Sequence, residues 1–306
     1  MLMETQILDG YQLAEEMHKK LKDQLSQLNG KSLVVAAILF SEDKGSQLYT
    51  QLKKEMAESL GIEYRVFSFS VKDNSEEIVK KLKDLNEDLA ITGIIIQKPW
   101  RKTWLNAHNL DKDSGKEQFD SWWHSLVSEL NPEKDVDGLH PSNLEALKTG
   151  DWRAEGRVLP ATCQATIRLL EKAFNTQHLF ADLRNNNLKI VIIGKSDLLG
   201  LPLFTILSSK RCDVEMIGSK ELKERIEQQK FLKDADVLVT ATGRKDLIKG
   251  SMIKEDCVII DVGEPQGDVE QSSVIGVAKA LTPVPGGVGP MTVVSLMENA
   301  IYLGNN

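Results

Sequence analysis

The sequence contains few cysteines, no long apolar run and no excess of positive charge. Its three cysteines, Cys163, Cys212 and Cys257, are far apart in 306 residues, which excludes a disulfide framework or a zinc site set by C-x-x-C spacing. No apolar run approaches the ~20 residues needed to cross a bilayer. The net charge of −7 excludes an extended surface for nucleic acid or anionic membrane. The first six residues lack the basic and apolar regions of a secretory signal, so we expect a cytoplasmic protein.

The length predicts about two domains, and the pattern of apolar residues predicts an α/β fold. Short apolar runs alternate with amphipathic segments, which is typical of a parallel sheet covered by helices. We expect an N-terminal α/β domain over 1–147, a Rossmann-like domain over 148–289, and a C-terminal helix at 290–306 that packs back on the first domain. The expected strands cover 32–40, 64–69, 91–96, 190–193, 213–217, 237–241 and 258–262, and the expected helices cover 10–28, 46–60, 75–89, 118–130, 141–147, 162–174, 201–209, 219–229 and 291–303.

A glycine loop follows the apolar run Ile190–Ile193. Gly194, Ser196, Gly200 and Pro202 form the pattern G-x-S-x-x-x-G-x-P, which differs from the commoner G-x-G-x-x-G of dinucleotide sites. The backbone N–H groups at the start of the next helix would face a pyrophosphate. The alternative is a turn that only joins a strand to a helix.

The residues after the next strand bear on the choice of dinucleotide. NAD-binding folds place an acidic residue about twenty positions beyond the glycine loop, where it holds the ribose hydroxyls. Here the strand ends in Ile217-Gly-Ser-Lys220. A hydroxyl and a cation, together with Lys195, suit a 2′-phosphate better and favour NADP. Glu215 is near the expected distance but lies within the strand, which leaves NAD possible.

The helix predicted from Ser46 carries two residues suited to acid–base chemistry. Leu48, Leu52, Met56 and Leu60 are expected to form its buried stripe, with Tyr49 and Lys53 four residues apart at the edge. Partial desolvation favours the neutral form of an amine, which lets it act as an acid or base beside an orienting phenol. The alternative is a surface lysine beside a half-buried tyrosine.

Polar side chains follow the strand that ends at Ile96. Gln97 lies at the carboxyl end of that strand, where open α/β sheets bind their ligands. Asp137 precedes a glycine, so it either binds the N–H groups of a ligand or forms an Asx turn, and the same choice applies to Asp135. These two residues and His140 could suggest a metal, but no paired His or Cys at ligand spacing accompanies them. We therefore expect no metal.

A tryptophan-rich segment spans 100–130. Trp100, Trp104, Trp122 and Trp123 lie among charges without a clear period. They could cover a pocket, but aromatic burial is routine and favours packing.

Five stretches together resemble the bifunctional methylenetetrahydrofolate dehydrogenase/cyclohydrolase family, the FolD-type enzymes, and the resemblance covers almost the whole chain. They are Ser46-Gln-Leu-Tyr-Thr-Gln-Leu-Lys53, Gly93-Ile-Ile-Ile-Gln97, Pro132-Glu-Lys-Asp-Val-Asp-Gly138, Gly194-Lys-Ser-Asp-Leu-Leu-Gly-Leu-Pro202 and Thr282-Pro-Val-Pro-Gly-Gly-Val-Gly-Pro-Met-Thr292. The chain differs at Gln97-Lys-Pro-Trp100, at Pro160-Ala-Thr-Cys-Gln-Ala165 and at Lys195, which replaces the family's common arginine and loses its planar fork.

The resemblance implies an enzyme of one-carbon metabolism that oxidises 5,10-methylenetetrahydrofolate with NAD(P)+ and hydrolyses the methenyl product to 10-formyltetrahydrofolate. It implies a homodimer and a folate cleft between the two domains. Its implied catalytic residues are Lys53, Tyr49 and Gln97; Tyr49, Asp137, Pro285, Gly286 and Gly287 would bind the substrate. The expected cofactor-binding residues are Gly194, Lys195, Ser196, Gly200, Pro202, Ser219 and Thr242. Two alternatives stay open: another NADP-dependent dehydrogenase of shikimate type, and a noncatalytic folate- or nucleotide-binding homologue.

Overall fold

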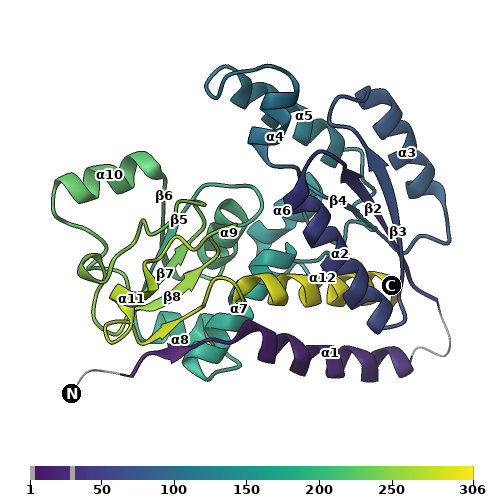
Figure 1. The fold of residues 1–306 in the computed structure, drawn as a ribbon. Coiled ribbons are helices and arrows are strands. Elements are labelled where there is room, and N and C mark those ends of the chain that lie inside the picture. The colour runs from purple at the N-terminus through teal and green to yellow at the C-terminus, as the bar shows by residue number, and fades with distance from the viewer. Residues whose placement is uncertain (1–3, 28–31, 306) are drawn as a thin grey trace. The chain divides into compact units, whose positions relative to one another are not determined.

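The computed structural model describes residues 4–27 and 32–305 and separates into two compact units (Figure 1). One unit comprises Met1–Met17, Ala146–Asp151 and Pro160–Ser295; the other comprises His18–Glu145, Trp152–Leu159 and Leu296–Asn306. We refer to them as the cofactor unit and the catalytic unit. Because the two units interleave along the chain, they do not define a single limit in sequence. The limits expected at 147 and 289 stay predictions.

The catalytic unit is built on a three-stranded parallel sheet in the order β3-β2-β4. The central strand β2 (Val34–Phe40) is almost wholly buried, which explains its unbroken apolar sequence. Helices α2 (Lys44–Ser59) and α3 (Ser75–Glu87) provide the crossover connections between β2, β3 (Glu63–Phe69) and β4 (Gly93–Ile96). The α/β class and these elements are confirmed, but the predicted end of the first helix near Leu28 and Gly30 lies outside the described residues.

The buried face predicted for α2 is wrong at Leu48 and Leu52, although Leu60, at the C-cap, is buried as expected. Leu48 and Leu52 are 59% and 40% exposed, whereas the buried residues of the helix are Ser46, Thr50, Lys53 and Ala57. Both sets of residues recur with a spacing compatible with one face of a helix, so periodicity alone could not choose between them. The mainly polar set faces inward because partners inside the unit satisfy several of its polar groups.

The tryptophan-rich segment forms two helices, α4 (Arg101–Ala107) and α5 (Gly115–Val127). Trp104 and Trp123 are buried, and Trp104 stacks on His108 with ring centroids 4.1 Å apart. Trp122 contacts Phe40 at the end of β2, with a centroid distance of 5.2 Å. These contacts confirm that tryptophans of the segment pack, whereas α4 was missed because its short sequence has no clear apolar period.

The cofactor unit contains a six-stranded parallel sheet in the order β1-β9-β8-β7-β5-β6. Four of its strands, β5 to β8, were predicted; β1 (Gln6–Ile7) and β9 (Ala280–Leu281), which are neighbours at one end of this order, were missed because two residues show no period. The sheet's remaining strands are β5 (Lys189–Ile193), β6 (Asp213–Ile217), β7 (Val237–Thr240) and β8 (Val258–Asp261), and the helices of the unit are α7 (Ala161–Phe174), α8 (Leu179–Asn185), α9 (Gly200–Ser209), α10 (Ser219–Glu227) and α11 (Gln271–Val274). Two short 3₁₀ helices, η1 (Leu147–Thr149) and η2 (Gly250–Met252), complete it.

Helices α1 (Gly10–Ser26) and α12 (Val288–Asn305) each contribute residues to both units, and α6 (Pro141–Ala146) lies almost wholly in the catalytic unit. The end of α12 packs in the catalytic unit, where Asn299 Nδ2 donates hydrogen bonds to Val136 O at 3.0 Å and Leu159 O at 2.8 Å. The predicted return of the C-terminal helix to the first domain is therefore confirmed. Across 4–27 and 32–305, the helices are too short or too polar to cross a membrane.

Candidate active site and cofactor site

A buried amine and an amide meet at the centre of the catalytic unit. Lys53 on α2 is only 5% exposed, and its Nζ donates a hydrogen bond of 2.7 Å to Oε1 of Gln97. Gln97 follows β4 directly, and its backbone N donates to Ile38 O on β2 at 2.9 Å. The structure thus brings these two predicted residues together at the carboxyl end of the sheet.

Asp43 ties the start of α2 to the segment after β4. Its buried carboxylate accepts hydrogen bonds from Ser46 Oγ and from the backbone N of Trp100, both at 2.7 Å. Ser46 Oγ also lies 3.2 Å from Lys98 O. These contacts fix α2, which carries Lys53, against the segment that carries Gln97. The sequence analysis missed Asp43, since a lone aspartate before a helix suggests only a cap.

The loop after α5 is organised by Asp135. This buried carboxylate accepts hydrogen bonds from the backbone N of Gly138 at 3.0 Å and of His140 at 2.6 Å, and from Asn143 Nδ2 at 2.8 Å. Burial raises the pKa of Asp135 to about 6, although these hydrogen bonds oppose the shift. The sequence left two roles open for Asp135, a ligand contact or an Asx turn. Its hydrogen bonds show that it forms the turn.

The same loop lies along β4 because Gly93 has no side chain. The backbone N of Ile94 donates to Lys134 O at 2.6 Å, and a Cβ on Gly93 would lie 2.2 Å from Val136 Cγ1. Only glycine permits this approach without displacing the neighbouring side chain. Ile94 pairs with Asp135 in parallel register. Asp137, two residues further along, therefore lies beside the end of β4.

Asp137 is half-buried and lies within electrostatic reach of Lys53. Burial raises the pKa of its carboxyl, while the positive charge of Lys53 lowers it. Tyr49, one turn before Lys53, is half-buried. Tyr64 on β3, which the sequence analysis did not select, is 6% exposed; burial and the charge of Asp137 raise the pKa of its phenol. An amine, an amide and a carboxylate therefore converge beside a buried tyrosine.

The glycine loop of the cofactor unit joins β5 to α9. Gly194 has a φ of +123°, and a Cβ on Gly200 would lie 1.9 Å from Gly194 O. Pro202 lies in the first turn of α9, where its missing N–H is not needed. The order β7-β5-β6 places this loop at the point where the strand order reverses. A close-packed glycine turn before a helix N-terminus fits the pyrophosphate of a dinucleotide.

Lys195, the positive charge expected to bind a 2′-phosphate, already has a negatively charged partner. Lys195 Nζ forms an ion pair with Glu221 on α10, and Glu221 Oε2 accepts a hydrogen bond from Gly218 N at 3.1 Å. Ser219 is exposed at the start of α10, and Ser196 is half-buried in the glycine loop. The sequence analysis missed Glu221, although glutamate at this helical position often completes a capping box.

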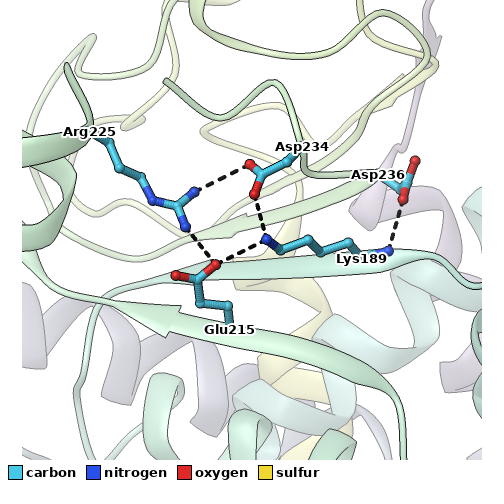
Figure 2. A network of polar contacts seen from close by, with 5 residues as sticks. All are labelled: Lys189, Glu215, Arg225, Asp234 and Asp236. Atoms are coloured by element: carbon cyan, nitrogen blue, oxygen red, sulfur yellow. Dashed lines mark hydrogen bonds and ion pairs between the residues drawn. The ribbon is translucent and has the colours of Figure 1, made fainter. Parts of the chain in front are cut away.

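Glu215, the alternative ribose ligand, belongs to a polar network on the sheet (Figure 2). Its carboxylate lies 2.5 Å from Arg225 Nη2 and 3.3 Å from Lys189 Nζ. Arg225 also pairs with Asp234 at 3.3 Å. Glu215 therefore anchors α10 to β5 and β6 rather than lying at the strand tip.

Thr242 follows β7 and is held by a buried carboxylate. Asp268 accepts hydrogen bonds from Thr240 Oγ1 at 2.7 Å and from the backbone N of Thr242 at 2.6 Å. It also accepts one from Arg244 N at 2.8 Å. These contacts fix the loop at the carboxyl end of β7, next to the strand that precedes the glycine loop.

The loop that contains Pro285, Gly286 and Gly287 packs against the start of α1 in the cofactor unit. Gly10 N donates to Gly286 O at 2.8 Å, and a Cβ on Gly10 would lie 1.8 Å from Gly287 O. Gly286 has a φ of +103°, and a Cβ there would lie 3.0 Å from Tyr11 Cε2. The sequence analysis missed Gly10 and Tyr11, which precede this loop by more than 270 positions.

Comparison with known proteins matches both units to models of one protein family. The NAD(P)-binding domain model of tetrahydrofolate dehydrogenase/cyclohydrolase matches residues 160–305, and the catalytic domain model matches 8–115. The bifunctional protein FolD of Staphylococcus aureus (strain Newman) is 32% identical over 98% of this chain and 96% of its own length.

Solved structures agree over nearly the whole chain. The bifunctional FolD enzyme of Campylobacter jejuni has 28% sequence identity and a TM-score of 0.80, and the match covers 99% of each chain. The enzyme of Trypanosoma brucei, solved with NADP cofactor and an inhibitor, has 26% identity and a TM-score of 0.79 over 99% of this chain and 98% of its own.

Fold and site together define a two-domain α/β enzyme with an NAD(P)-binding domain. The chain belongs to the bifunctional tetrahydrofolate dehydrogenase/cyclohydrolase family. It is therefore an enzyme that oxidises 5,10-methylenetetrahydrofolate and hydrolyses the methenyl product. The family match decides against the shikimate-type alternative. Among the residues that the structure describes, no group of three His, Cys, Asp or Glu side chains could hold a metal ion.

The raised pKa of Asp135 predicts a pH dependence of stability. Its pKa of about 6 in the folded chain exceeds the unfolded value of about 3.9. The folded carboxyl thus holds its proton to higher pH, so its contribution to the unfolding free energy is full below about pH 4 and is lost as pH rises to about 6. Between these pH values, wild type should lose on the order of 3 kcal/mol relative to Asp135→Asn in denaturant unfolding. A pH-independent difference between the two proteins would contradict the assignment.

Proposed function

We propose that Lys53, Tyr49 and Gln97 carry the chemistry of the active site and that Asp137 binds the substrate beside them. The observation that supports this most directly is the buried hydrogen bond from Lys53 Nζ to Gln97 Oε1, with the Asp137 carboxyl in electrostatic reach. A buried amine is rare unless it has a polar partner. Here the partner is a neutral amide, which orients the amine without fixing its charge.

In the oxidation, the C–H bond of the methylene bridge breaks and its electron pair leaves as hydride, which produces the methenyl cation. NAD(P)+, when bound, supplies the hydride acceptor. A neutral Lys53 tolerates the new positive charge, whereas an ammonium would oppose it. Burial disfavours the charged form of an amine, which suits this step, whereas the nearby Asp137 carboxylate acts in the opposite direction.

In the hydrolysis, water adds to the methenyl carbon. Lys53 accepts a proton from the attacking water, which leaves a hydroxyl on the carbon, and returns that proton to the N5 nitrogen as the bond from carbon to N5 breaks. The hydroxyl loses its own proton to solvent as the C=O forms, which leaves the formyl group on N10 and releases one H+ overall. Gln97 holds the amine through Oε1, and Tyr49 assists from the preceding turn of α2. Lys53 is thus the acid and base of the second reaction.

Asp137 binds the N–H groups of the pterin ring in this proposal. A half-buried carboxylate accepts such hydrogen bonds strongly, because little solvent competes with them. Pro285, Gly286 and Gly287 bind the folate as well. The close approach of Gly10 to Gly287 holds the backbone of that loop in one conformation.

We propose NADP+ as the preferred hydride acceptor. Gly194, Ser196, Gly200 and Pro202 form the pyrophosphate turn, with Thr242 on the neighbouring loop. Ser219 and the exposed Lys220 supply a hydroxyl and a cation near the end of β6, and Lys195 supplies a second cation when a phosphate displaces Glu221 from it, which suits a 2′-phosphate. NAD+ contains the same pyrophosphate as NADP+, so the same turn also binds NAD+.

We further propose that the protein acts as a homodimer in the cytoplasm. Strand β3 lies at the edge of the three-stranded sheet and carries the 37% exposed Val66. An edge strand offers unpaired N–H and C=O groups to a second copy. Cell fractionation that placed the protein outside the cytoplasm would contradict the proposed location.

The dehydrogenase reaction is tested with purified protein, 5,10-methylenetetrahydrofolate, and either NADP+ or NAD+. Reduction of the dinucleotide should appear as new absorbance of NAD(P)H, with higher kcat/KM for NADP+. An equal or higher kcat/KM for NAD+ would contradict the proposed preference.

The role of Lys53 is tested by Lys53→Gln, with Lys54→Gln as the matched control. Lys54 is the next residue, but it is 41% exposed and pairs with Glu58 on the surface. Hydrolysis of methenyltetrahydrofolate should fall by about 10²–10⁴-fold in K53Q, the range expected when an acid–base group is lost. K54Q should retain wild-type hydrolysis. Substantial hydrolysis by a folded K53Q protein would reject the assigned role.

The dimer is tested by light scattering after size exclusion. Wild type should have the mass of two chains, and Val66→Lys should shift the protein toward the monomer by placing a charge on the edge strand. Ile226→Lys is the matched control, because Ile226 is similarly exposed, at 36%, but lies on α10. A monomeric wild type, or equal effects of both variants, would contradict the proposed interface.

A further inference from the structure

The most informative group that the mechanism does not use is the carboxylate of Glu221. It forms an ion pair with Lys195 Nζ, and both side chains are nearly half exposed, at 43% and 46%. Glu221 lies in the first turn of α10, directly beyond the tip of β6. In dinucleotide-binding folds, this strand tip meets the adenosine ribose.

The ion pair changes what the site offers to a 2′-phosphate. Lys195 is already neutralised by a neighbouring carboxylate. A phosphate can therefore interact with the positive charge of Lys195 only by displacing Glu221. The displaced carboxylate would still repel the phosphate at short range. A ribose with free hydroxyls would instead find an acceptor in Glu221, because a carboxylate accepts hydrogen bonds from hydroxyl groups.

Two observations keep this carboxylate in place and charged. Glu221 Oε2 accepts the hydrogen bond from Gly218 N, and Arg225 on the next turn is bound to Glu215 and Asp234 (Figure 2). The first bond holds Glu221 at the start of α10, and the contact of Arg225 with Glu215 on β6 attaches the helix to the sheet. The hydrogen bond from Lys195 lowers the pKa of Glu221 to about 2, so the group is ionised throughout the neutral range.

We propose that Glu221 narrows the preference of this enzyme for NADP+ over NAD+, by weakening the binding of a 2′-phosphate and providing an acceptor for the ribose diol of NAD+. Glu221 is a specificity-determining residue and takes no part in hydride transfer. The inference rests on the proposed cofactor site, but it concerns binding and does not require turnover.

The test is Glu221→Gln, measured as Kd for NADP+, NAD+ and 2′,5′-ADP by titration calorimetry on the full chain. Glutamine retains an oxygen that can accept from Gly218 N, so the helix start is preserved while the charge is lost. The Kd for NADP+ should fall on the order of tenfold, since one repulsive charge is removed and Lys195 is released. The Kd for NAD+ should stay constant or rise.

Two further variants make the result specific. Glu227→Gln removes the same charge at the end of α10, where the side chain is 63% exposed and lies 3.7 Å from Lys223; it should change the Kd for NADP+ less than twofold, because exposed charges are screened. In Lys195→Gln/Glu221→Gln, the gain in NADP+ affinity should disappear. Equal effects of E221Q and E227Q, or an unchanged ratio of the two affinities in E221Q, would overturn the proposal.

These outcomes are separate from those of the proposed function. A protein that binds dinucleotides without turnover would fail the dehydrogenase assay, yet E221Q would still shift the ratio of Kd values. Conversely, an active enzyme whose ratio is insensitive to Glu221 would retain its function and contradict this inference alone.

Discussion

The catalytic unit depends on holding one amine out of water. A lysine side chain at 5% exposure loses most of its hydration, and the hydrogen bond to Gln97 replaces part of it. This requirement explains why the inward face of α2 is mainly polar. Ser46 and Lys53 both find partners inside the unit, so the helix exposes Leu48 and Leu52 instead. The helix buries less apolar surface because its inward face carries this lysine. Such a loss of stability is common where function requires a particular residue.

Backbone contacts that only glycine allows fix the loops around both sites. Gly93 lets the Asp135 loop lie along β4, and Gly200 lets α9 begin against Gly194. Each approach would bring an added Cβ within 2.2 Å of another atom, far closer than van der Waals contact allows. Such contacts let the backbone of each loop pack directly against a neighbouring segment. This matters because Asp137 and Ser196 lie on loops.

The sequence allowed the class of fold and most of the regular elements to be predicted, because buried parallel strands are continuous apolar runs that alternate with amphipathic helices. It also allowed Lys53, Gln97 and Asp137 to be selected, through the resemblance and their places after strands or on helix faces. It could not show which face of α2 is buried, since two sets of residues shared one period. It also could not show the role of Asp43 or Gly10, whose partners are distant in sequence.

Glu215 and Glu221 show why a residue's place decides its role more than its type. Both are glutamates near the end of one strand, and either could satisfy a rule based on distance from the glycine loop. Glu215 pairs with Val191 in the register of β5 and β6, so its carboxylate lies over the sheet, where Lys189 and Arg225 bind it. Glu221 lies one helical turn beyond the strand, where Lys195 reaches it from the glycine loop. The first carboxylate therefore stabilises α10, and the position of α10 in turn holds the second at the strand tip.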